Sequence, residues 1–152
     1  MQTHESSINQ YLTFMLSDEE YGIHILKVQE IKGWETATPL PNTPDYMLGV
    51  INLRGAIVPV MDMRKRFHIQ SAASLASSVI IFIHHQTSTA QRTVGIAVDA
   101  VSDVYQVEPA AIKAKPEFGV AVNTDFIEGL IPIDQKMVIL LDIAALIEDE
   151  IQ

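Results

Sequence analysis

The sequence predicts an all-β protein made of two five-stranded barrels related by internal duplication, with short helices that include a C-terminal one. Two observations carry this prediction. One passage occurs twice in the chain, and short runs of β-forming residues alternate with turn residues roughly every 8–12 positions, as in small barrels. Half of the 152-residue chain also has the size of one SH3-like barrel of five strands.

The clearest repeat sets residues 49–63 on residues 129–143 without a gap. Most pairs exchange one apolar residue for another. Four pairs are identical, namely Gly49/Gly129, Ile51/Ile131, Val58/Val138 and Asp62/Asp142.

Two further repeats follow the same order along the chain. Residues 22–31 align with residues 95–104, and residues 11–15 align more weakly with residues 79–83. The chain is therefore interpreted as two copies of one β unit, and positions where the copies differ in chemistry are candidates for function.

The repeats predict one domain over residues 1–152 with two barrel-forming halves. The first half covers about 10–69 and the second about 79–150. Between them, residues 70–78 are rich in Ser, Ala and Gln and are predicted to be a linker. The sequence leaves open whether strands are exchanged between the two barrels.

The first half begins with a predicted strand over residues 10–16 and a polar turn. A second strand over 21–25 and an irregular turn over 26–31 follow. Thr43 and Pro44 resemble an N-cap and first turn of a short helix that ends at Leu48. Two strands hinged at Gly55 complete this half, at about 49–54 and 56–61.

The second half repeats this plan and ends in a helix. Its predicted strands cover about 79–84, 92–98 and 103–107, with the repeated double strand at 128–141. Asp142 is predicted to cap a final helix with one apolar stripe, and Asp62 the equivalent helix start. That stripe is formed by Ile143, Leu146, Ile147 and Ile151.

Composition excludes several classes of function. The chain has no cysteine, so it has neither disulfides nor a thiolate metal site. Its 19 acidic residues outnumber 10 basic ones, which argues against nucleic acid as a partner. No apolar run is long enough to span a membrane, and the polar start does not resemble a signal peptide. We therefore expect a cytoplasmic protein without direct membrane insertion.

Enzyme and metal motifs are absent from the sequence. It contains no glycine-rich phosphate loop, no zinc-binding histidine pattern and no nucleophile elbow. His84 and His85 are adjacent, and adjacent strand residues point to opposite faces. We expect an exposed strand end there rather than a metal site.

The main repeat differs most in its polar residues. Asn52 and Arg54 in the first copy correspond to Pro132 and Asp134 in the second. On a strand, Asn52 and Arg54 would share one face, while Ile51 and Leu53 would face the core. Two interpretations stay open: Arg54 forms a surface ion pair with a nearby carboxylate, or it organises a docking surface together with Glu30.

Apolar residues recur at equivalent places near the expected junction of the two units. They are Val28 and Ile31 in the first copy and Val101 and Val104 in the second. Most such residues belong to a core, but a groove between two barrels would also need them to bind a partner helix.

One motif of the first half is distinctive: an Asn-Leu-Arg-Gly element at 52–55 followed by Ile-Val-Pro-Val-Met-Asp at 57–62. With this element the sequence resembles the CheW family of bacterial chemotaxis coupling proteins and the related regulatory domain of the kinase CheA. The resemblance covers about residues 10–148 and includes Asp18–Ile31, Asn42–Pro44, Val94–Val104 and Ala114–Phe118.

This resemblance implies two SH3-like barrels around a shared core, with neither catalysis nor a cofactor. It implies an adaptor that couples the cytoplasmic tips of transmembrane chemoreceptors to the regulatory domain of CheA, recruited to receptor arrays. A coupler for a different array, such as a pilus or surface-sensing system, is the alternative.

The resemblance also implies site residues. The groove between the barrels would bind the receptor through Val28, Glu30, Arg54 and Val104, with Asn52 added from the same element. Lys113 and Phe118 match positions that bind the kinase at one end of the molecule. His24 departs from the family pattern, which has an acidic residue there, and leaves pH sensitivity open.

Overall fold

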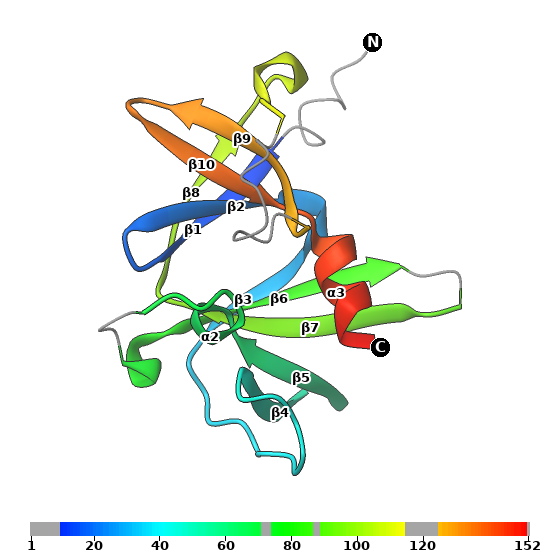
Figure 1. The fold of residues 1–152 in the computed structure, drawn as a ribbon. Coiled ribbons are helices and arrows are strands. Elements are labelled where there is room, and N and C mark those ends of the chain that lie inside the picture. Colours follow the sequence, from blue (N-terminus) through cyan, green and yellow to red (C-terminus); the bar gives the residue numbers. More distant parts are fainter. Residues whose placement is uncertain (1–9, 71–73, 87–88, 115–124, 152) are drawn as a thin grey trace.

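The computed structural model describes residues 10–70, 74–86, 89–114 and 125–151. In this part of the chain, strands form two five-stranded sheets, and α3 packs against β6 (Figure 1). Barrel 1 has the order β8 (Ala100–Gln106), β1 (Gln10–Leu16), β2 (Glu19–His24), β10 (Lys136–Leu141) and β9 (Ile127–Ile133). Barrel 2 has the order β3 (Val28–Gly33), β6 (Val79–Gln86), β7 (Gln91–Val98), β5 (Ala56–Asp62) and β4 (Met47–Leu53). The short helices are η1 (Ile25–Lys27), α2 (Met63–Arg66), η2 (Leu75–Ser77), η3 (Pro109–Ala111) and α3 (Ile143–Ile151).

The all-β prediction is confirmed, and the strand orders show the duplication. Each strand of barrel 1 stands where its repeat partner stands in barrel 2. The register agrees as well: Leu140 lies beside Gly22 in barrel 1, and Val60 lies beside Gly95 in barrel 2. Both barrels combine strands from the two halves of the chain, because β1 and β2 join β8–β10 while β6 and β7 join β3–β5.

The weakest of the three predicted repeats is wrong by one residue. Thr13 pairs with Gly22, and Phe82 pairs with the equivalent Gly95, so Tyr11 corresponds to Ile80 and not to Val79. A slip of one residue exchanges the two faces of a strand. The alignment pairs Phe14 with Phe82 because the residues are identical. In the structure Phe14 faces the shared core, whereas Phe82 faces the interior of barrel 2.

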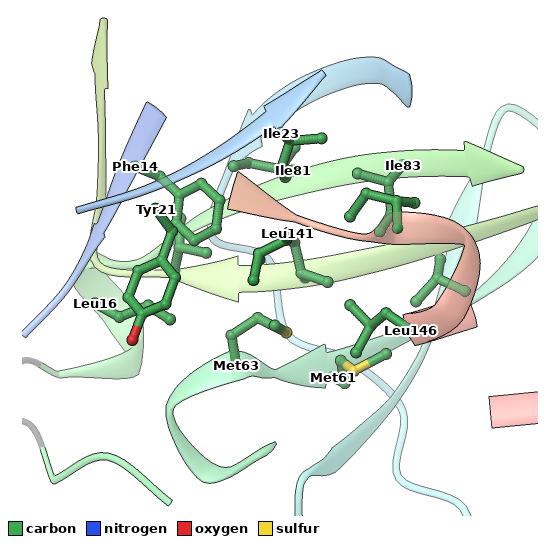
Figure 2. Close-up of a cluster of buried hydrophobic side chains, with 14 of the residues drawn as sticks. Phe14, Leu16, Tyr21, Ile23, Met61, Met63, Ile81, Ile83, Leu141 and Leu146 are labelled. Carbon is green, nitrogen blue, oxygen red and sulfur yellow. The ribbon is translucent and has the colours of Figure 1, made fainter. Parts of the chain in front are cut away.

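The described residues form three buried apolar clusters. The largest lies between the barrels and takes side chains from both, including Phe14, Ile23, Ile81 and Leu146 (Figure 2). A smaller cluster fills each barrel interior, around Val138 in barrel 1 and around Phe82 in barrel 2. Strand β6 is buried on both faces, since Ile80 and Phe82 point into barrel 2 while Ile81 and Ile83 point into the shared core.

Two local predictions are wrong. The segment predicted as an irregular turn over 26–31 contains the end of η1 and most of β3, which begins at Val28. The helix predicted from Thr43 to Leu48 is a turn in which the Met47 amide donates to the Pro44 carbonyl at 3.0 Å. Pairing with β5 draws Met47 and Leu48 into β4, because tertiary contacts override a local capping signal.

Other boundaries differ by a few residues. Strand β8 begins at Ala100, ahead of the predicted start at 103, and the predicted linker holds η2 at its end. The predicted caps are confirmed: Asp62 Oδ1 accepts from the Arg64 amide and Asp142 Oδ1 from the Ala145 amide, each at 3.0 Å. Three residues of the predicted stripe on α3, Ile143, Leu146 and Ile147, are buried.

Candidate docking surface

The hairpin between β4 and β5 carries the candidate arginine. Arg54 and Gly55 form its two-residue turn with φ of 52° and 91°. Such turns require positive φ at both positions, which glycine adopts freely. Asn52 Oδ1 accepts a hydrogen bond from the Gly55 amide at 2.8 Å and supports the turn. Arg54 therefore lies in the turn. The prediction that Arg54 and Asn52 share one face of a strand is wrong.

Arg54 forms an ion pair with Glu30 on β3. Strands β3 and β4 are the two edges of the second sheet, so the pair links the edges and closes barrel 2. The Arg54 side chain is 71% exposed, whereas that of Glu30 is 19% exposed. The carboxylate is therefore held by the barrel, while much of the guanidinium faces solvent. At the equivalent positions barrel 1 has Asp103 and Asp134, which carry the same charge.

The two valines of the predicted receptor surface lie on different barrels. Val28 begins β3 and packs partly buried against the shared core. Val104 lies on β8, an edge strand of barrel 1, and is 45% exposed. Its repeat partner Ile31, on the corresponding edge strand of barrel 2, is 43% exposed. The structure thus joins Glu30, Arg54 and Asn52 at one hairpin and places Val104 on the other barrel.

Sequence reasoning did not single out a hollow at the mouth of barrel 2. It has a volume of about 490 Å³ and is lined by residues from β3, β5, β7 and α3. Ile57, on β5, borders it and is 65% exposed. Leu53 and Gln29, the neighbours of Arg54 and Glu30, also line it, so the hollow adjoins the ion pair. The available signal was Ile57, a large apolar residue two positions after the Arg-Gly turn.

The predicted kinase-binding residues are only partly described. Lys113 is exposed, and its backbone pairs with Leu130 through hydrogen bonds of 2.7 and 2.9 Å. Val50, the repeat equivalent of Leu130, pairs in the same way with Thr38 in barrel 2. Lys113 therefore extends the edge of barrel 1. Phe118 lies outside the described residues.

The prediction of an exposed strand end at the two histidines is wrong. His84 and His85 lie within β6, which continues to Gln86, and both are half-buried. His85 sits between Lys27 and Glu148, at 3.3 Å from each. Among the described residues, no group of three or more His, Asp or Glu side chains could hold a metal ion.

No helix in the described ranges is long and apolar enough to cross a membrane.

The CheW-like domain family model matches residues 10–150. The chain is 44% identical to the chemotaxis protein CheW of Klebsiella aerogenes over 93% of this chain and 82% of that protein. It is 38% identical to a probable chemotaxis protein CheW of Rhizobium etli over 91% and 86%.

A solved structure agrees with these sequence matches. The crystal structure of the scaffolding protein TtCheW from Thermoanaerobacter tengcongensis superposes with a TM-score of 0.78 at 34% identity, over 88% of each chain. The family match spans both barrels, including the hairpin with Arg54 and the edge strand with Glu30. On this evidence the chain belongs to the CheW family.

Proposed function

We propose that this protein is a non-enzymatic adaptor that couples chemoreceptors to the histidine kinase CheA. Membership of the CheW family supports the role, since relatives are named chemotaxis proteins and one is described as a scaffolding protein. The receptor would bind at Val28, Glu30, Asn52, Arg54 and Val104, and the kinase regulatory domain at Lys113 and Phe118. The observation that carries the receptor site is the exposed ion pair between Glu30 and Arg54.

The geometry of this pair suits recognition. Glu30 pairs with one nitrogen of the guanidinium, Nη1, and the Arg54 side chain stays largely exposed in the turn of the hairpin. Arginine presents five donors in a planar fork, so a guanidinium anchored on one carboxylate can still bind a partner's carboxylate or carbonyl. Because the turn and the partner strand fix both ends of the pair, little side-chain entropy is lost on binding.

Charge reversal of Arg54 tests this site. Arg54→Glu replaces the ion pair by two carboxylates, yet exposed pairs contribute only about 0–1 kcal/mol to stability. We expect the melting temperature to fall by no more than a few degrees, while co-sedimentation with receptor cytoplasmic fragments and CheA is largely lost. Asp134→Lys, at the equivalent turn of barrel 1, is the matched control and should keep receptor binding.

The reciprocal variant separates recognition from closure of the barrel. Glu30→Arg combined with Arg54→Glu restores an ion pair of opposite polarity. If Arg54 itself contacts the receptor, this double variant recovers its melting temperature but not receptor binding or kinase activation. Recovery of both would show that the pair acts structurally, and unfolding of Arg54→Glu would contradict the proposed site.

A further inference from the structure

The chain passes between the barrels at two crossovers of different chemistry. The first is η1, Ile25–Lys27, which leads from β2 in barrel 1 to β3 in barrel 2. The second is Asp99, which leads from β7 in barrel 2 to β8 in barrel 1. Each crossover is held by polar side chains from neighbouring elements, so the chemistry of those side chains determines when it can loosen.

Fixed charge holds the Asp99 crossover. Arg64 Nη1 donates to Asp99 Oδ1 at 3.1 Å, and the Ser17 amide donates to Asp99 Oδ2 at 2.7 Å. Arg64 is 5% exposed and also donates to Asp62. A guanidinium does not lose its proton in proteins, so this crossover has no titratable donor near neutral pH.

Two imidazole nitrogens hold the other crossover. The Leu26 amide donates to His24 Nδ1 at 3.2 Å, and Lys27 Nζ lies 3.3 Å from His85 Nδ1. Lysine has only donors, so His85 Nδ1 must accept. His85 Nε2 lies 3.3 Å from Glu148 Oε2 on α3, and a carboxylate requires the hydrogen on that nitrogen. The neighbours therefore select the neutral Nε2–H tautomer of His85.

Protonation would remove both of these bonds. A protonated imidazole carries a hydrogen on each nitrogen, so neither His24 nor His85 could accept at Nδ1. His85 would then repel Lys27 and Arg92, its cross-strand neighbour on β7, while its attraction to Glu148 would increase. Imidazole is the side chain that changes charge between about pH 5 and 8.

The groups around His24 favour the same response. The ring of Tyr11 meets the imidazole edge-on at 5.3 Å, and Glu128 interacts with it electrostatically. Partial burial and then Asp142 raise the pKa of Glu128, whereas His24 and Lys27 act to lower it. Above the pKa of Glu128, its carboxylate and a protonated His24 would attract each other.

We propose that η1 is a histidine-tethered crossover that loosens when His24 and His85 are protonated, and that this regulates the adjoining receptor surface. Leu26, at its centre, is 56% exposed, whereas the flanking Ile25 and Val28 pack partly buried against the shared core. Loss of the two tethers would therefore free chiefly the middle of the turn. Val28 and Glu30 follow directly on β3 and would share its motion. The regulatory part rests on the proposed receptor function, whereas the loosening does not.

Amide hydrogen exchange of the full chain tests the loosening without any partner. Protection factors, corrected for the intrinsic exchange rate at each pH, should fall about tenfold for the Leu26 amide between pH 8 and 5.5, as for one lost hydrogen bond. His24→Asn with His85→Gln retains acceptors that do not titrate and should abolish this fall. His84→Asn, on the opposite face of β6, should leave it intact.

Three outcomes would overturn the proposal. Protection of Leu26 that is independent of pH, or a fall that persists in the double variant, refutes the tethers. Binding to a receptor cytoplasmic fragment should weaken with the same midpoint and should lose its pH dependence in the double variant. If the crossover loosens but receptor binding does not depend on pH, the regulatory part is refuted. If the protein fails to bind the receptor at any pH, the proposed function is refuted, and the hydrogen exchange of Leu26 alone decides whether the histidine tethers exist.

Discussion

Barrels 1 and 2 share their strand order and register but differ where their strands end. In both, a glycine of the second strand lies against an aliphatic side chain of the neighbouring parallel strand: Gly22 against Leu140, and Gly95 against Val60. A Cβ at either glycine would force these neighbouring side chains to shift. The duplicated copies have therefore kept the contacts that position their strands.

The mouth of barrel 1 is closed by an ion pair. Lys136 on β10 reaches Glu20 on β2 at 2.5 Å, and the Glu20 side chain is 2% exposed. The hydrogen bond to Glu20 raises the pKa of Lys136. Tyr21, the next residue along β2, faces the shared core, where its ring lies 5.9 Å from that of Phe67.

The same place in barrel 2 is open. The repeat partners of Lys136, Glu20, Tyr21 and Phe67 are Ala56, Thr93, Val94 and Ile147, and all four line the hollow beside Arg54. Barrel 2 instead closes its edges with Glu30 and Arg54, where barrel 1 has two aspartates. Because the two barrels share their strand order and register, these differences belong to the ends of the barrels.

The largest expected difference between the barrels concerns two repeat-related glycines. A Cβ on Gly49 would lie 2.1 Å from the Thr38 carbonyl oxygen, at a φ of 141°. On Gly129 it would lie 2.7 Å from the Ile112 side chain and 2.9 Å from the Lys113 carbonyl oxygen. Gly49→Ala should lower the free energy of unfolding by about 3 kcal/mol or more, through strain and overpacking together. Gly129→Ala should cost less, about 1–3 kcal/mol, because its backbone is not in the positive-φ region and both contacts need smaller shifts than at Gly49.

Denaturant unfolding of both variants measures this difference. Equal losses would contradict the prediction. They would show that the backbone around Gly129 in barrel 1 is packed as tightly as the backbone around Gly49 in barrel 2.

The next effect tests the closed mouth of barrel 1. Lys136→Met leaves the Glu20 carboxylate buried without its cation, which is unfavourable in a low-dielectric site. We expect a lower melting temperature, with a smaller loss than for Gly49→Ala. Adding Glu20→Gln removes the buried charge and should recover most of the loss. If the second change brings no recovery, the ion pair is not what closes the mouth.

The sequence predicted the parts of the fold that depend on local pattern. Strand period, turn residues and the ungapped repeat located most strands, and Asp62 and Asp142 were recognised as caps by their position before apolar helices. The Thr43-Pro44 signal failed because a cap and a turn use the same residues there, and pairing with β5 decided between them.

The features that distinguish the two barrels depend on contacts between distant segments. Arg54 meets Glu30 because two edge strands converge, and Lys136 meets Glu20 because β10 pairs in parallel with β2 from the other end of the chain. Neither meeting leaves a periodic signal in the sequence. The sequence proposed Glu30 as a partner of Arg54 only through the resemblance and the repeat. For the open mouth of barrel 2 it offered one signal, the apolar Ile57 shortly after the turn.

The smallest expected effect concerns Glu128, whose repeat partner in barrel 2 is the apolar Leu48. Partial burial raises the pKa of Glu128 above its ordinary value of 4.5, and Asp142 adds to this. The native state then binds more protons than the unfolded chain between 4.5 and the raised pKa, so its stability falls as the pH rises through that interval. Above the interval the charged carboxylate is a constant cost.

Glu128→Gln should therefore raise stability at pH 7. The gain should be less than about 1 kcal/mol, because the side chain is partly exposed and solvent screens its charge. Below about pH 4 the variant should bring no gain. Melting temperatures at the two pH values, with Asp134→Asn as an exposed control, check the sign. A gain that persists at the lower pH would mean that the change improves packing at the start of β9, as an apolar residue does in barrel 2, and that the charge is not the cause.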